Sequence, residues 1–106
     1  MSEDDFVLAT EESNVPEDSM KLVMAVGRSI LLARHSGQVF GVSNKCPHMG
    51  CSLVNGKLKE FTVTCPCHSW EFDIRNGQYC GNKAIMLMTY ECKIQGGKII
   101  VRLVDI

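Results

Sequence analysis

Two short runs of cysteine and histidine are the residues of this sequence best suited to chemistry. The first is Cys46-Pro47-His48 and the second is Cys65-Pro66-Cys67-His68, with residues 49–64 between them. Thiolate and imidazole groups bind soft and borderline metal ions such as iron and zinc. The spacing therefore offers Cys46, His48, Cys65 and His68 as two sulfur and two nitrogen ligands to a single metal centre.

The sequence around both runs resembles the Rieske 2Fe-2S proteins. The segment CPHMGC, residues 46–51, is similar to the first cluster loop of that family, and CPCHSWEFD, residues 65–73, is similar to the second. Asn76-Gly77 and a closing strand at Lys98 to Val104 also follow the family pattern. The resemblance extends from about Phe6 to Val104.

The resemblance implies one 2Fe-2S cluster, with Cys46 and Cys65 on the inner iron and His48 and His68 on the outer iron near solvent. Two ferric ions, two sulfides and two thiolates sum to a neutral centre, whereas four thiolates would leave it doubly negative. Adding an electron to a neutral centre is easier, so Rieske sites lie at roughly −150 to +300 mV against about −400 mV for plant-type ferredoxins. The ligand set predicts a moderately oxidising centre.

A structural zinc ion is the alternative use of the same four ligands, because zinc accepts two sulfur and two nitrogen donors in a tetrahedron. Zinc fingers and ribbons commonly place their ligands in pairs two to four residues apart, followed by a helix. The order C-x-H followed by C-x-x-H is unusual for them. The sequence favours iron and sulfide.

The four remaining cysteines raise the question of disulfides. In the quinol-oxidising Rieske proteins, cysteines at the positions of Cys51 and Cys67 form a bond that clamps the two loops, so the resemblance implies that bond here. Cys80 and Cys92 match no family position, and we expect both to be free, buried thiols that behave as small hydrophobic groups. Four cysteines allow three pairings, so a second bridge remains open.

The second loop departs from the respiratory Rieske type, in which a serine and a tyrosine donate hydroxyl hydrogen bonds to cluster sulfurs. Those positions hold Trp70 and Phe72 here, and Ser69, one residue earlier in a segment taken as extended, would point the opposite way. A potential in the lower half of the Rieske range follows. We expect Met49 and Trp70 to shield the cluster from water. The covering proline that the family often has is absent from Gly81-Asn82-Lys83.

The hydrophobic pattern has a period of two with frequent turn signals, which predicts an antiparallel all-β domain. The family resemblance makes this a β sandwich with a small cluster-binding subdomain formed by two loops, at about residues 44–73, in a single domain over residues 1–106. Asn55-Gly56 is expected to form a turn with positive φ, and residues 81–84 to be irregular. The expected strands are 6–9, 20–26, 29–35, 39–42, 61–64, 70–74, 85–94 and 98–104.

Two other groups of residues could suggest a metal site. His35 lies at a predicted strand end, where a surface or turn histidine is the simpler interpretation than a third ligand. The methionines alternate along strands, which favours filling of the core over copper binding. They are Met20, Met24, Met86 and Met88.

Composition narrows the function classes. The 106 residues are 45% hydrophobic with a net charge of −1, and no apolar run approaches the ~20 residues that cross a bilayer. The bases do not cluster with aromatic residues, so nucleic-acid binding is not expected. The acidic start, Met1 to Asp5, lacks the features of an export signal, which favours the cytoplasm.

The sequence contains no nucleotide loop or motif for a second iron, so we interpret it as an electron carrier and not an enzyme. The predicted function is one-electron transfer by a soluble Rieske-type ferredoxin, between a reductase and an oxygenase or other terminal acceptor. The alternative is a small Rieske subunit of a larger oxidoreductase such as a nitrite reductase. A zinc-held interaction module is a third, weaker hypothesis.

Overall fold

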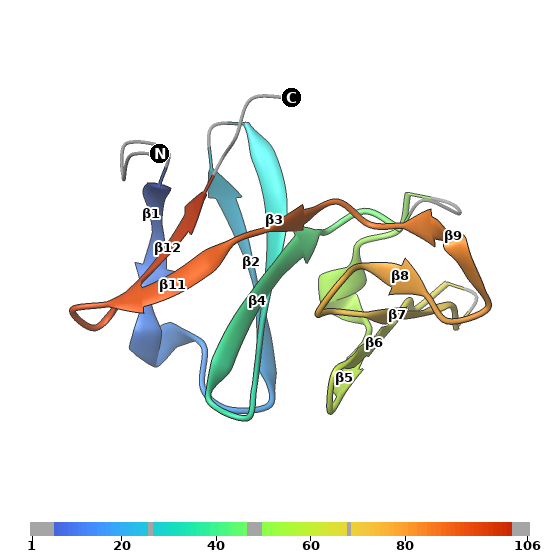
Figure 1. The fold of residues 1–106 in the computed structure, drawn as a ribbon, viewed down its shortest axis with the longest axis horizontal. Coiled ribbons are helices and arrows are strands. Elements are labelled where there is room, and N and C mark those ends of the chain that lie inside the picture. Colours follow the sequence, from blue (N-terminus) through green and yellow to red (C-terminus); the bar gives the residue numbers. More distant parts are fainter. Residues whose placement is uncertain (1–5, 26, 47–49, 68, 103–106) are drawn as a thin grey trace.

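The structure, a computed structural model, describes residues 6–25, 27–46, 50–67 and 69–102. The regular elements in the described part of the chain are strands and two short 3-10 turns (Figure 1). Within these residues no helix is long and apolar enough to cross a bilayer. The strands are β1 Phe6–Glu11, β2 Ser19–Ala25, β3 Arg28–His35, β4 Gln38–Ser43, β5 Lys57–Lys59, β6 Thr62–Thr64, β7 Glu71–Asp73, β8 Gln78–Tyr79, β9 Asn82–Met86, β10 Thr89–Tyr90, β11 Cys92–Gln95 and β12 Lys98–Arg102, and the 3-10 turns are η2 Glu12–Asn14 and η3 Leu53–Asn55.

The strands form three sheets, and every strand pair is antiparallel. Their orders are β1-β12-β11, β10-β4-β3-β2 and β5-β6-β7-β8-β9. The predicted terminal hairpin is β11 with β12, in register from Cys92 opposite Val101 to Gln95 opposite Lys98. The all-β, antiparallel prediction is confirmed.

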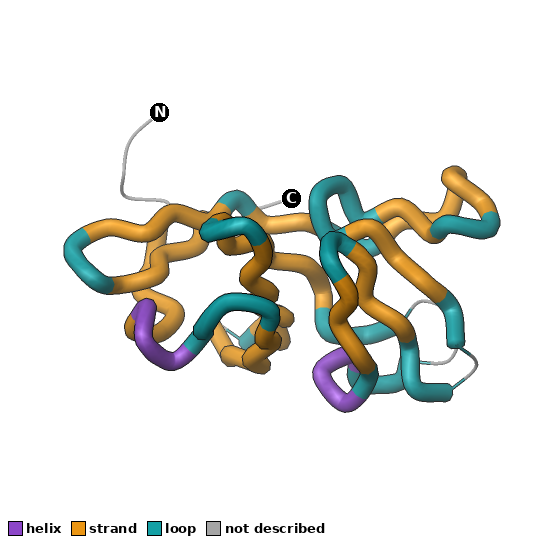
Figure 2. The backbone as a smooth tube through the Cα atoms, turned by 90° about the horizontal axis from the view of Figure 1, so that it is seen from below, coloured by secondary structure: helices purple, strands orange, loops and turns teal. Residues whose placement is uncertain are grey.

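Strand β3 lies at the centre because it is buried on both faces. Ile30 and Leu32 point into a core shared with the β1-β12-β11 sheet, while Leu31 and Ala33 point into a core shared with the β5–β9 sheet. All four side chains are fully buried. This explains an unbroken apolar run inside a sequence that otherwise alternates. The sheet of β5–β9 lies beside the rest of the molecule (Figures 1 and 2).

Turn geometry agrees with the sequence at two places and differs at a third. Ser36 and Gly37 both have positive φ in the β3–β4 hairpin, and Gly77 has φ of 78° after β7. The prediction of positive φ at Asn55-Gly56 is wrong, because Gly56 has φ of −87°. Glycine is needed there for another reason: a Cβ would collide with the carbonyl oxygen of Thr64.

Three further predictions about the second half of the chain are corrected. Residues 81–84 were expected to be irregular, but residues 82–84 belong to β9, and the single strand expected over 85–94 is divided among β9, β10 and β11. Met24, Met86 and Met88 are 67%, 52% and 44% exposed and do not fill the core. Met20 alone among the four packs against it. Alternation placed these side chains on one face of a strand, but Met24 and Met86 are exposed on their strands, and Met88 lies in the connection between β9 and β10.

Candidate metal centre

Residues 46–51, the first predicted cluster loop, and residues 65–70, the first part of the second predicted loop at 65–73, are connections of the same length between antiparallel partners. Lys45 pairs with Ser52 across the base of the first loop. Thr64 pairs with Glu71 across the base of the second, as the last residue of β6 and the first of β7. The loops are therefore held by sheet hydrogen bonds at both of their ends.

The same two backbone hydrogen bonds close each loop. In the first, the Cys46 N–H donates to the Cys51 carbonyl (2.9 Å) and the Gly50 N–H donates to the Cys46 carbonyl (2.7 Å). In the second, the Cys65 N–H donates to the Trp70 carbonyl (2.7 Å) and the Ser69 N–H donates to the Cys65 carbonyl (3.0 Å). Each predicted cysteine ligand thus has its N–H and C=O fixed by its own loop.

The fifth residue of each loop adopts the left-handed conformation that brings the chain back onto the cysteine. Gly50 has φ of 74° and Ser69 has φ of 60°. Glycine adopts this region without cost, whereas serine does so with strain. The expectation that Ser69 belongs to an extended segment is therefore wrong, and its direction cannot be argued from strand alternation.

A disulfide joins the two loops through Cys51 and Cys67, whose Cα atoms are 6.5 Å apart. This confirms the pairing that the resemblance implied. The sulfur of Cys65 lies within 4.8 Å of both bonded sulfurs, so the bridge runs directly beside a predicted ligand. Because the bridge occupies two of the four loop cysteines, a four-thiolate metal site cannot form there. The two loop cysteines outside the bridge are Cys46 and Cys65.

Cys46 and Cys65 are each only 1% exposed and belong to the core that lies between β3 and the β5–β9 sheet. The other sequence-predicted residues of the centre, His48, Met49 and His68, lie outside the described residues. A donor set of two buried thiols on matched, cross-linked loops, each loop containing one histidine in its sequence, fits a mixed sulfur and nitrogen site.

Asn44 is a supporting residue that the sequence analysis missed. It is 3% exposed and lies next to the first loop. Its N–H donates to the Ser29 carbonyl, its carbonyl accepts from the Leu53 N–H, and its Oδ1 accepts from the Val54 N–H (2.9 Å). This residue therefore ties the first loop to β3 and to η3. A polar residue two positions before the first predicted ligand, Cys46, was the available signal.

Aromatic side chains from the end of the second loop, from β7 and from β8 pack together against the core. The Trp70 and Tyr79 rings are stacked, with centroids 4.1 Å apart and planes 7° from parallel. Phe72, fully buried, lies 5.6 Å from the Tyr79 ring, its partner across β7 and β8. Trp70 was predicted to shield the centre, but Tyr79 was not considered. Their shared face follows from the strand pairing, which the sequence alone did not provide.

The last two cysteines are both free thiols, as expected. The expectation that both are buried is wrong for Cys80, which is exposed in the β8–β9 connection. Cys92 is largely covered, and burial, together with the nearby charge of Glu91, raises its thiol pKa to about 12. Its side chain lines a hollow of about 570 Å³ between β4 and β10–β11, which contains none of the predicted ligands.

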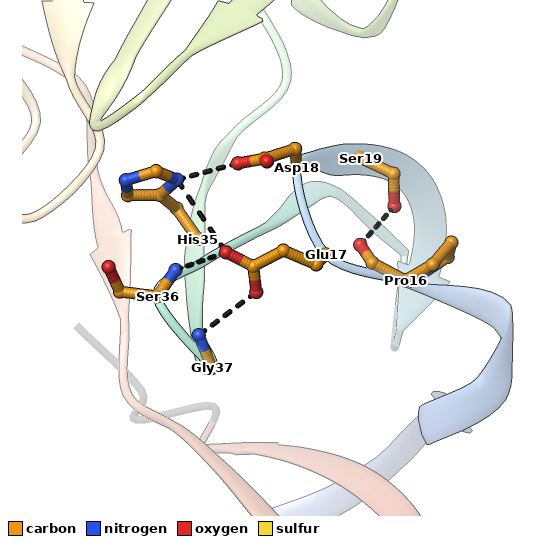
Figure 3. A network of polar contacts seen from close by, with 7 residues as sticks. All are labelled: Pro16, Glu17, Asp18, Ser19, His35, Ser36 and Gly37. Carbon is orange, nitrogen blue, oxygen red and sulfur yellow. Dashed lines mark hydrogen bonds and ion pairs between the residues drawn. The ribbon is translucent and has the colours of Figure 1, made fainter.

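His35 belongs to a polar network at the end of β3, not to the cysteine loops (Figure 3). Its Nδ1 lies 2.6 Å from the Asp18 carboxylate. Glu17 accepts hydrogen bonds from the backbone N–H groups of Ser36 and Gly37. The side chains of Glu17, Asp18 and His35 are close enough to hold a metal ion. Their polar atoms already form hydrogen bonds within the network, and we interpret the network as structural.

An ion pair fixes the turn after β7. Both oxygens of the Asp73 carboxylate accept from the Arg75 guanidinium, at 3.0 and 2.9 Å, and this hydrogen bonding holds the Asp73 pKa below its usual value. The same guanidinium lies 4.4 Å from the centre of the Phe61 ring. The turn that leads from the second loop to Tyr79 is therefore held by charge as well as by backbone hydrogen bonds.

Comparison with known proteins gives a consistent result. A family model described as the Rieske [2Fe-2S] domain matches residues 5–91. The ferredoxin component of the alkene monooxygenase system of Xanthobacter autotrophicus is 33% identical over 73 residues, which are 68% of this chain and 60% of that relative. The iron-sulfur subunit of the cytochrome b6-f complex of Chlorobaculum tepidum is 30% identical over 89 residues, 84% of this chain and 49% of that relative.

The chain thus spans between about half and three fifths of the length of these two relatives. Among solved structures, the ferredoxin of carbazole 1,9a-dioxygenase from Nocardioides aromaticivorans IC177 has a TM-score of 0.85. The match covers 92% of this chain and 96% of that one, at 21% sequence identity. At that identity the likeness establishes the fold.

Proposed function

This chain is a member of the Rieske [2Fe-2S] domain family, and we propose from that premise that it is a soluble, cytoplasmic electron carrier. It passes single electrons from a reductase to an oxygenase or another terminal oxidoreductase. The observation that carries the proposal is the pair of matched loops, joined by a disulfide, each of which contains one buried cysteine. Similarity to a ferredoxin component of an oxygenase system supports the choice of partners.

The proposed ligands are Cys46 and Cys65, with His48 and His68 completing the set from the same loops. The bound cluster supplies reversible one-electron chemistry between neutral and singly negative states. The protein's part is to hold the thiols in fixed positions, through the loop hydrogen bonds, and to keep the ligand sulfurs away from water. A histidine edge near solvent would provide the contact through which a partner exchanges electrons.

The disulfide supports the proposal in a second way, because it fixes the distance between the two loops independently of the metal. A ligand set that is already organised changes little between oxidation states. Small structural change on electron transfer is what a carrier requires, since reorganisation of the site would slow the exchange.

Metal content and spectroscopy of the purified protein test the proposal. We expect two irons and two acid-labile sulfides per chain, and an anisotropic paramagnetic signal after reduction with dithionite. Cys46→Ser and His68→Ala should each abolish that signal. His35→Ala is the matched control, since it removes a histidine outside both loops, and it should retain the signal. One zinc ion and no sulfide would overturn the proposal in favour of an interaction module.

The partner assignment needs a separate experiment. Reduced protein mixed with its partner oxygenase should be reoxidised in step with product formation. Stable copurification with a large catalytic chain would instead support a subunit of a larger oxidoreductase. That outcome would replace the shuttle between two enzymes while leaving the assignment of the metal centre intact.

A further inference from the structure

We propose that Tyr79 is a positioning residue for the redox centre, because it holds Trp70 as a wall over the core that contains the predicted ligand Cys65. The inference rests on the proposed function, since it concerns the environment of the bound cluster. It assigns to Tyr79, and to the Gly81 backbone beside it, a role in setting the reduction potential.

The contact between Tyr79 and the loop is short. The Trp70 carbonyl accepts a hydrogen bond from the Cys65 N–H at 2.7 Å, so Trp70 is the residue at which the second loop closes. Its ring lies parallel to the Tyr79 ring at 4.1 Å. Both rings pack against the core that contains Cys46 and Cys65. A change in the position of Tyr79 therefore reaches the loop through one intervening side chain.

The β8–β9 connection keeps Tyr79 in place. The Cys80 N–H donates to the Glu71 carbonyl (2.8 Å), which ties this connection to the start of β7. A Cβ built on Gly81 would lie 2.8 Å from the Cζ and from the hydroxyl oxygen of Tyr79. The glycine therefore leaves room for the outer end of the ring. Any side chain there must displace the ring, since the atoms it meets belong to a side chain and not to backbone.

The direction of the effect on the potential follows from charge. Reduction takes the centre from neutral to singly negative, and water stabilises the charged form better than an apolar wall does. An intact wall makes reduction harder and lowers the potential. Opening the wall should raise the potential.

The test compares four variants of the holoprotein by protein-film voltammetry. Tyr79→Leu removes the stacking ring, Gly81→Ala displaces it, and Tyr79→Phe preserves the stack without the hydroxyl. Tyr90→Leu is the matched control, because Tyr90 is the only other tyrosine and packs against the other core. We expect a positive shift of the midpoint in the first two variants and none in Tyr79→Phe or in the control.

A second measurement reports on the wall itself. Trp70 is the only tryptophan, so near-ultraviolet circular dichroism around 290 nm follows its environment directly. The signal should change in Tyr79→Leu and Gly81→Ala and stay in Tyr79→Phe. If Tyr79→Leu does not assemble, Gly81→Ala answers the same question, because both rings are still present.

The outcomes separate this inference from the proposed function. Absence of a 2Fe-2S cluster in the parent protein would overturn the proposed function. A normal cluster in Gly81→Ala with a changed Trp70 signal but an unchanged midpoint would overturn the role of Tyr79 alone. A shift in Tyr90→Leu equal to that in Tyr79→Leu would also overturn it, since the effect would then be a general consequence of losing a ring.

Discussion

Removing the disulfide between Cys51 and Cys67 should destabilise the protein by about the amount that the chain-entropy model predicts for the bond. The bond joins residues 16 positions apart, and for such a loop the model gives about 3 kcal/mol. At an unfolding entropy of about 2.1 cal/mol/K per residue, this corresponds to roughly 14 °C for a chain of 106 residues. A cluster held by both loops, as proposed above, is lost when the chain unfolds, so it does not replace the bond as a restriction on the unfolded chain.

The bond therefore contributes its full effect through the unfolded chain. In Cys51→Ser/Cys67→Ser, the midpoint temperature for loss of the visible cluster absorption should fall by roughly 14 °C. Cys80→Ser, an exposed thiol outside the bridge, serves as the control and should unfold like the parent. An unchanged midpoint in the double variant would refute the reasoning, because the bond would then not restrict the unfolded chain.

Three further predictions concern single side chains. Phe72→Tyr should raise the reduction potential by roughly 65 to 130 mV, the equivalent of one hydrogen bond to a charged acceptor, as measured by voltammetry. Iodoacetamide at pH 8 should label Cys80 and spare Cys92 in the folded protein. The raised Cys92 pKa of about 12 leaves almost no thiolate at that pH. Mass spectrometry after digestion identifies the labelled cysteine. Arg75→Gln should reduce stability at neutral pH and have little effect in strong acid. The lowered pKa of Asp73 contributes stability at pH values above the unfolded pKa of about 3.9, and this stability is lost as the pH falls. Urea unfolding at several pH values checks this.

The fold was largely accessible from the sequence because alternation and turn residues are local. The central strand is an example: Ile30 to Ala33 is apolar throughout, and burial on both faces explains it. The exposure of Met24 and Met86 was not accessible. Alternation tells which face a residue occupies, but whether another sheet covers that face depends on packing between distant segments.

The candidate site also has features that the sequence predicted and features that it did not. The two loops and the pairing of Cys51 with Cys67 were identified through their resemblance to a family, and the structure contains the bond. The left-handed conformation of Ser69 was not predicted, because serine gives no signal of positive φ as Gly50 does. The stack of Tyr79 on Trp70 also required the register of β7 with β8, which places Tyr79 beside residues of the second loop.

Phe72 is the residue at which stability and redox tuning meet. It is fully buried in the core, and it also occupies the position from which respiratory Rieske proteins donate a tyrosine hydroxyl. A hydroxyl introduced there must find an acceptor, because a buried polar group without one costs about 1 to 3 kcal/mol. Phe72→Tyr therefore has two distinguishable results. A raised potential with unchanged stability means that the hydroxyl reaches a cluster sulfur, whereas an unchanged potential with lowered stability means that the second loop holds β7 in a different orientation from the respiratory proteins.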